Sequence, residues 1–82
     1  MKRKKLLKQL SNYFDMDRRE LCERRDKMKL LLKQLRQKER ELKQRCKTEI
    51  DDDKLRRLKK HRATVHAQRV KGIKALKKMS CD

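Results

Sequence analysis

The fold of this chain is decided by residues 28–58, which read MKLLLKQLRQKERELKQRCKTEIDDDKLRRL. An apolar residue recurs every seven positions at Met28, Leu35 and Leu42, and a second seam position follows four residues after each. Alternating steps of three and four residues are the pattern of a coiled-coil seam. Most of the other residues are Lys, Arg, Gln and Glu, whose straight side chains favour a helix.

The same seven-residue repeat extends back toward the N-terminus and closes at Ile50. We therefore predict one long helix over residues 13–50, with a weaker seam before Met28 because Arg18 and Arg25 occupy seam positions. The predicted seam of this helix consists of Leu21, Met28, Leu32, Leu35, Leu42, Cys46 and Ile50.

Three successive aspartates, at 51–53, interrupt the pattern. Aspartate is poor inside a helix and good at an N-cap. We therefore predict a turn over 51–53, with Asp52 or Asp53 capping a second helix over 54–79 and residues 80–82 as a tail. The alternative is a single straight helix of about 65 residues that runs through the aspartates.

The second helix has its own apolar stripe, made of Leu55, Leu58, Val65, Ile73 and Leu76. Antiparallel pairing about the turn places Glu39 between Arg62 and Arg69. A half-buried acid between two bases adds little stability but sets the register of two helices. The alternative is that all three side chains extend to water. The predicted fold is thus all-α, an antiparallel two-helix coiled-coil hairpin with a basic N-terminal extension.

The N-terminal extension consists of a basic, amphipathic leader over residues 1–12 and the start of the long helix. The helix over 54–79 is too short to cover residues 1–20. We therefore expect an unpartnered apolar surface that binds a second protomer or another protein, made of Leu6, Leu7, Leu10, Tyr13 and Phe14. Because two helices with one narrow seam bury little apolar area, we also expect the chain to self-associate, as a homodimer.

The composition excludes several classes of protein. The 82 residues include 29 Lys and Arg, 12 Asp and Glu, two aromatic residues, one Gly and no Pro. Sheet folds need many β-branched and aromatic residues with frequent turn residues, which are missing here. No apolar run approaches the ~18 residues of a membrane span. No catalytic or metal-ligand spacing is present, so we predict no enzymatic activity, no cofactor and no metal.

The formal net charge of +17 is concentrated on one helix. Residues 54–81 contain 11 bases and no acid. A face of one sign repels itself and favours an anionic partner, although a merely solvated face is the alternative. The predicted nucleic-acid-binding residues, opposite the apolar stripe, are Arg56, Arg57, Lys60, Lys71, Lys74 and Lys78.

Nucleic-acid phosphate, in RNA or DNA, is the expected polyanion. A coiled-coil adaptor for another protein is the second hypothesis, and binding to an anionic membrane through residues 1–14 is the least favoured. The three cysteines are odd in number and widely spaced, which predicts reduced thiols and a cytoplasmic protein, or a nuclear one in a eukaryote.

Overall fold

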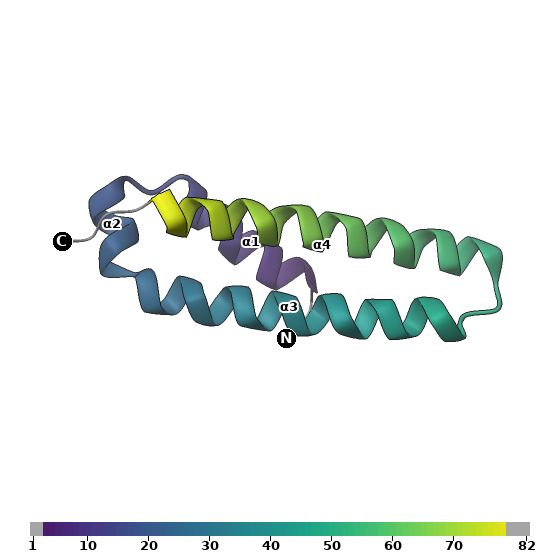
Figure 1. The fold of residues 1–82 in the computed structure, drawn as a ribbon. Helices are drawn as coiled ribbons and strands as arrows, with labels where there is room; N and C mark the ends of the chain where they lie inside the picture. The colour runs from purple at the N-terminus through teal and green to yellow at the C-terminus, as the bar shows by residue number, and fades with distance from the viewer. Residues whose placement is uncertain (1–2, 79–82) are drawn as a thin grey trace.

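The computed structural model describes residues 3–78, and the regular structure in this range is entirely helical (Figure 1). The all-α prediction is therefore confirmed. The helices of this range, in chain order, are α1 (Arg3–Phe14), α2 (Arg18–Glu23), α3 (Arg25–Thr48) and α4 (Asp52–Lys78).

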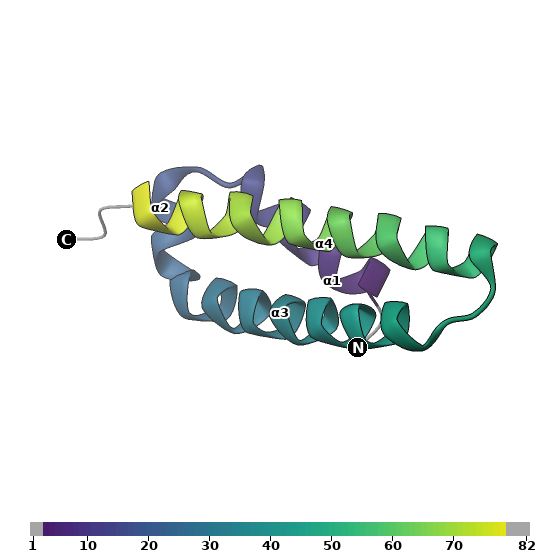
Figure 2. The ribbon, with the colours of Figure 1, turned by 45° about the vertical axis from the view of Figure 1, so that its right-hand side comes forward.

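The two long helices, α3 and α4, lie side by side and run in opposite directions (Figures 1 and 2). The short helix α1 packs against both of them. It runs antiparallel to α3, since its first turn lies near Arg45 and its last turn near Arg24. This third helix was not part of the two-helix prediction.

The helix expected over 13–50 is interrupted at residues 15–17, where the backbone is not helical. The carboxylate of Asp17 accepts a hydrogen bond from the backbone N–H of Glu20 at 2.9 Å and so caps α2. Such a side-chain bond offers the backbone an alternative to a continuing helix. A second irregularity at Arg24 separates α2 from α3. The leader is thus able to fold back along the long helices.

The connection between α3 and α4 occupies residues 49–51, slightly earlier than the predicted turn over 51–53. The carboxylate of Asp51 accepts hydrogen bonds from the backbone N–H groups of Asp53 and Lys54, at 2.9 and 3.0 Å. Asp51 is therefore the N-cap of α4, in place of the predicted Asp52 or Asp53. A cap satisfies N–H groups that have no partner inside the helix.

The prediction that Ile50 closes the apolar seam is wrong, because its side chain is 94% exposed. Helix α3 ends at Thr48, and Glu49 has extended backbone angles. Helical periodicity stops there, so Ile50 no longer points toward α4.

A single apolar core joins α1, α3 and α4. Its buried members are Leu6, Leu10, Met28, Leu31, Leu32, Leu35, Leu42 and Val65. Leu7, Tyr13 and Phe14 are partly buried against this core. The expectation that the apolar residues of the leader find no partner within the chain is therefore wrong, because the break at 15–17 returns α1 to the long helices.

The remaining seam residues are only half-buried. They are Leu21, Cys46, Leu55, Leu58, Ile73 and Leu76. Leu31 is buried although it lies beside the predicted seam, and it borders a hollow with Gln9 and Tyr13 of α1. The apolar face of α3 is therefore wider than a two-helix seam, because α3 packs against two helices at once.

Gly72 is a buried position of α4 that faces both α1 and α3. A Cβ atom at this position would lie 2.7 Å from Cδ2 of Leu32 and 3.3 Å from Cδ1 of Leu10. The absence of a side chain therefore lets the backbone of α4 pack directly on side chains of α1 and α3.

Two cysteines lie within the described range. Cys46 is a free, half-buried thiol, whereas Cys22 is disulfide-bonded. The expectation of reduced thiols is therefore wrong for Cys22. Cys81, the predicted helix end at residue 79 and the predicted tail over 80–82 lie outside the described residues. No helix within residues 3–78 has an apolar stretch long enough to cross a bilayer.

Candidate nucleic-acid interface

The six basic residues predicted to bind nucleic acid are all exposed on α4. These residues are Arg56, Arg57, Lys60, Lys71, Lys74 and Lys78. Within residues 3–78, no ion pair joins any of them to a carboxylate. The acids of α4 are confined to its first turn, at Asp52 and Asp53. The face therefore carries an unneutralised positive charge along most of the helix.

Lys71 makes a contact with α1 that the sequence did not predict. Its Nζ lies 4.4 Å from the centroid of the Phe14 ring, at the end of α1. A cation over an aromatic face is stabilised by about 0.5–1 kcal/mol at exposed sites. Lys71 thus helps to attach α1 to α4 while its charge stays at the surface.

Further cations from α1 and α3 gather beside α4, at the first turn of α1. They surround a hollow of about 510 Å³, lined by Arg3, Lys4, Lys38, Glu41, Leu42, Arg45, Leu58 and His61. Sequence reasoning missed this cluster. The run of bases at residues 3–5 was visible, but no spacing rule connects it with His61.

The surroundings of His61 in this hollow lower its pKa. Burial lowers the pKa of His61 below its ordinary value of 6.5, and the positive charges of Arg3 and Lys4 lower it further. Lys60 and Arg57 on α4 act in the same direction. The imidazole therefore lies in a region of positive potential, where acquiring a further proton is disfavoured.

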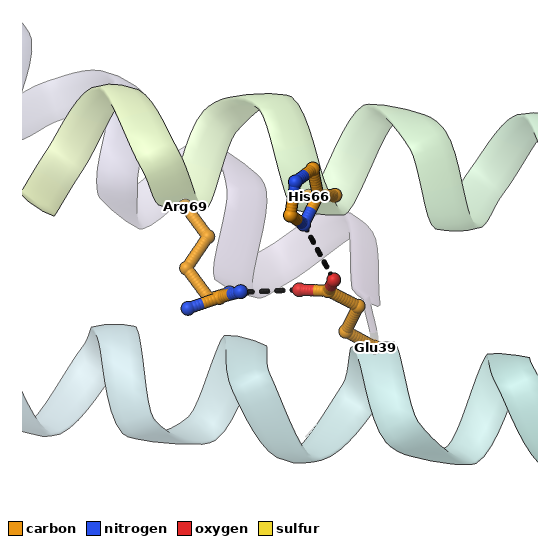
Figure 3. A network of polar contacts seen from close by, with 3 residues as sticks. All are labelled: Glu39, His66 and Arg69. Atoms are coloured by element: carbon orange, nitrogen blue, oxygen red, sulfur yellow. Dashed lines mark hydrogen bonds and ion pairs between the residues drawn. The ribbon is translucent and has the colours of Figure 1, made fainter.

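A polar network connects the two long helices (Figure 3). One carboxylate oxygen of Glu39 lies 2.6 Å from Nδ1 of His66, and the other accepts a hydrogen bond from Nε of Arg69 at 2.7 Å. The predicted contact with Arg69 is therefore present. The second partner is His66 in place of Arg62, which only borders the same hollow as Glu39.

Glu39 contacts His66, and not the predicted Arg62, for a geometric reason. Side chains of a helix lean toward its N-terminus. Because α3 and α4 are antiparallel, Glu39 leans toward the C-terminal end of α4, where His66 and Arg69 lie. Burial raises the pKa of the Glu39 carboxyl, but the hydrogen bonds and charges of Arg69 and His66 outweigh it and the net pKa is lowered.

An apolar groove opens between α3 and α4. Its lining comprises Asp26, Lys29, Leu30, Leu32, Lys33, Arg36, Arg69, Ile73 and Leu76. Leu30 is 59% exposed here, which is unusual for a large apolar side chain beside a core. The groove is therefore a second candidate for a binding surface, apolar at its base and basic at its rim.

No protein-family model, curated protein or solved structure matches this chain. The chemistry of the described surface is thus the basis for assigning a function. That surface offers exposed cations on α4, a cationic hollow around His61 and an apolar groove beside Leu30.

Proposed function

We propose that this protein binds nucleic acid, RNA or DNA, through contacts with backbone phosphates, and that it has no enzymatic activity. The observation that supports this proposal is the exposed and unneutralised basic face of α4. Ordinary solvated helix faces mix both signs at i, i+4 spacing. A face of one sign is self-repelling unless an anion such as phosphate lies against it.

In this proposal the antiparallel pair α3–α4 acts as a coiled-coil hairpin that displays the basic face on a rigid rod. Proteins that hold single strands stack bases on exposed aromatic side chains. Tyr13 and Phe14 are instead packed against the core. The expected ligand is therefore a helical nucleic acid, contacted largely without regard to its base sequence.

The test is a binding titration with a short RNA duplex and a short DNA duplex, each at several salt concentrations. We expect the affinity to fall steeply between about 50 and 200 mM salt, because each phosphate contact releases counterions. The variant Lys74→Gln/Lys78→Gln is expected to bind more weakly and to show a smaller salt slope, by about one unit per lost contact.

The matched control for this test is Lys43→Gln/Lys47→Gln, which removes the same charge from exposed positions of α3. It is expected to weaken binding less than the α4 variant does. Affinity that does not depend on salt would contradict the proposal. Equal losses in the two variants would show that α4 is not the interface.

A second candidate function, as a coiled-coil adaptor that self-associates or binds another protein, is favoured by the exposed Leu30 and the adjoining apolar groove. Sedimentation equilibrium distinguishes it from the first. Self-association of a chain with net charge +17 strengthens as salt screens the repulsion, whereas phosphate binding weakens. The variant Leu30→Glu is expected to abolish such association while leaving the helical content unchanged.

Binding to an anionic membrane through α1 is the third hypothesis, and the structure lends it little support. Leu6 and Leu10 are 1% and 0% exposed, so insertion would require α1 to leave the core. Sedimentation with anionic vesicles tests it. We expect any binding to the vesicles to be electrostatic and therefore to disappear at high salt. A cytoplasmic location, or a nuclear one in a eukaryote, agrees with the proposed ligand, whereas the disulfide of Cys22 is typical of an oxidising compartment.

A further inference from the structure

The hollow around His61 lies at the first turn of α1. In Figure 2 this turn lies beside α3 and α4, nearer to the connection between them than to their far ends. The space of about 510 Å³ described above is bordered by all three helices. Leu42, which is buried, and Leu58, which is half-buried, supply its apolar lining. The hollow is therefore a product of the tertiary fold.

Cations from two helices converge on this space, and a histidine from a third helix lies beside them. Arg3 and Lys4 belong to α1, Lys38 and Arg45 belong to α3, and His61 belongs to α4. A second hollow of about 440 Å³ adjoins the first and shares Arg45 and His61 with it. The residues added by this second hollow include Lys54 and Arg57.

The acids bordering the two hollows are already engaged. The carboxylate of Glu41 lies 3.2 Å from Nζ of Lys38. The carboxylate of Glu49 accepts a hydrogen bond from the backbone N–H of Asp51 at 3.1 Å. Neither forms an ion pair with Arg3, Lys4 or Arg45 within the described part of the chain. In the first hollow, Glu41 is the one carboxylate beside Arg3, Lys4, Lys38 and Arg45, so the lining keeps a net positive charge.

Two further features agree with an anion site. The first turn of α1 contains no acid, so the positive end of the helix dipole adds to the charge of Arg3 and Lys4. The pKa of His61 is lowered first by burial and then by the charges of Arg3 and Lys4, so the ring lies close to both residues in the hollow. Guanidinium groups bind phosphate oxygens through paired, charge-assisted hydrogen bonds.

We propose that this hollow binds one phosphate group, held by Arg3, Lys4 and Arg45, with the protonated ring of His61 as a further donor. The inference deepens the proposed function and depends on it only for the source of the phosphate, which would be one position on the nucleic-acid backbone. A phosphate seated here would fix where the strand lies relative to the basic face of α4.

Occupation of the site changes the protonation of His61. In the free protein, cations face the imidazole from α1 (Arg3, Lys4), from α3 (Lys38, Arg45) and from α4 itself (Arg57, Lys60), with Lys54 of α4 beside the adjoining hollow and with Glu41 and Glu49 as the bordering acids. A bound phosphate supplies an opposite charge and favours the imidazolium. His66 lies on the same helix but contacts Glu39, so it serves as an internal control.

The experiment follows the ring resonances of both histidines by NMR between about pH 4 and 9 on the full chain. It is run on the free protein, with inorganic pyrophosphate, and with a short duplex. We expect either anion to raise the pKa of His61 by about one unit, as an opposite charge nearby does, and to change that of His66 much less. Equal shifts of the two histidines would overturn the inference.

Two variants on α1 form a matched pair for the same measurement. Arg3→Gln/Lys4→Gln removes two lining cations, whereas Lys5→Gln/Lys8→Gln removes the same charge from exposed positions on the same helix. We expect at least a several-fold loss of pyrophosphate affinity and of the His61 shift in the first variant only. Equal losses in both would show general charge attraction and no site. Circular dichroism verifies that both variants keep the helical content.

The failure of this inference is distinguishable from failure of the proposed function. Salt-dependent duplex binding without a selective response of His61 overturns the phosphate site and leaves the α4 interface in place. A selective response to pyrophosphate without any duplex binding supports a phosphate site that accepts small molecules and overturns nucleic-acid binding.

Discussion

Glu39 shows how a single residue links the two long helices. Its carboxylate is 17% exposed and has two partners on α4, while its main partner Arg69 is 19% exposed (Figure 3). Charged groups at such partial burial lose solvation, so a missing partner costs more than it does at the surface. The pair contributes chiefly by making one register of α3 against α4 more stable than the registers shifted by a turn.

The first prediction concerns removal of this charge. Glu39→Gln is expected to lower the free energy of unfolding by about 1 kcal/mol, because it leaves Arg69 without a counter-charge. The matched control is Glu41→Gln, which breaks the more exposed pair with Lys38 and is expected to cost less than about 0.5 kcal/mol. Urea unfolding measures both. Equal effects would show that Glu39 behaves as a surface residue.

Acidification gives a second prediction at the same residue. The pKa of Glu39 is lowered in the folded state, so the pair stabilises the protein above the ordinary pKa of 4.5. This contribution is lost as the pH falls through the lowered folded pKa. Between about pH 6 and pH 3, the wild-type protein is therefore expected to lose more stability than Glu39→Gln does. Thermal unfolding at each pH checks this, and parallel curves would contradict it.

Gly72 permits the close packing of three helices, and a side chain there tests that packing. Gly72→Leu is expected to destabilise the protein by about 1–3 kcal/mol, because its atoms have no space between Leu10 and Leu32. Gly72→Ala is expected to be nearly neutral. Its gain of roughly 1 kcal/mol in helix propensity offsets the displacement of the Leu32 side-chain end. The control is Ala67→Leu, at an exposed position of α4.

At the scale of elements, caps and breaks decide where each helix begins, and α1 decides how the others are covered. Asp17 and Asp51 cap α2 and α4, and each follows an irregular stretch. Helix α1 is only 12 residues long, or about 18 Å, so it has little intrinsic stability in isolation. Its helical state therefore depends on burial of Leu6 and Leu10.

The cap at Asp51 supports a prediction about the start of α4. Asp51→Ala is expected to destabilise the protein by about 1 kcal/mol, since two backbone N–H groups lose their acceptor. Asp52→Ala removes the same charge from the next residue without removing the cap, and is expected to cost only a few tenths of a kcal/mol. Chemical unfolding of the two variants compares them. A larger loss in Asp52→Ala would show that the dipole and not the cap dominates.

The role of α1 supports a prediction about the shared core. Leu10→Ala is expected to cost about 2–5 kcal/mol, because a fully buried leucine loses its side chain beside Gly72 and Leu32. Ser11→Ala, at the next and exposed position, serves as the control and is expected to change little. If Leu10→Ala is nearly neutral, then α1 is not packed on α3 and α4 in solution.

At the scale of the whole molecule, charge repulsion opposes a small core. The net charge is +17 on a body that measures about 50 × 20 × 17 Å. Only a few ion pairs compensate it within residues 3–78, and most of them are exposed. Repulsion of this kind is longer in range than any single contact, and it is reduced by dissolved salt or by a bound polyanion.

A prediction about salt follows from this repulsion. The melting temperature is expected to rise by several degrees between about 20 and 500 mM sodium chloride, since about 1 kcal/mol corresponds to 4–8 °C in a chain of this size. Lys74→Gln/Lys78→Gln is expected to melt higher at low salt and to show a smaller rise. A melting temperature that falls with salt would contradict the prediction.

Helical content could be predicted from the sequence alone, and so could a connection near the aspartates and the exposure of the bases on α4. Each depends on residues a few positions apart, through helix periodicity, capping and side-chain charge. The pairing of Glu39 with Arg69 was also predictable, since the short connection limits the register of α4 against α3. The exposure of Ile50 could not be predicted, because it depends on the residue at which α3 ends.

Only the tertiary structure decided where α1 lies, and with it the chemistry of the surface. The break at residues 15–17 was not visible as a reversal of direction, so Leu6 and Leu10 were expected at the surface although they are core residues. The same reversal brings Arg3 and Lys4 to His61, some 57 residues further along the chain. Local interactions determine which residues are helical, whereas the sharing of one small apolar core among three helices determines which charges meet.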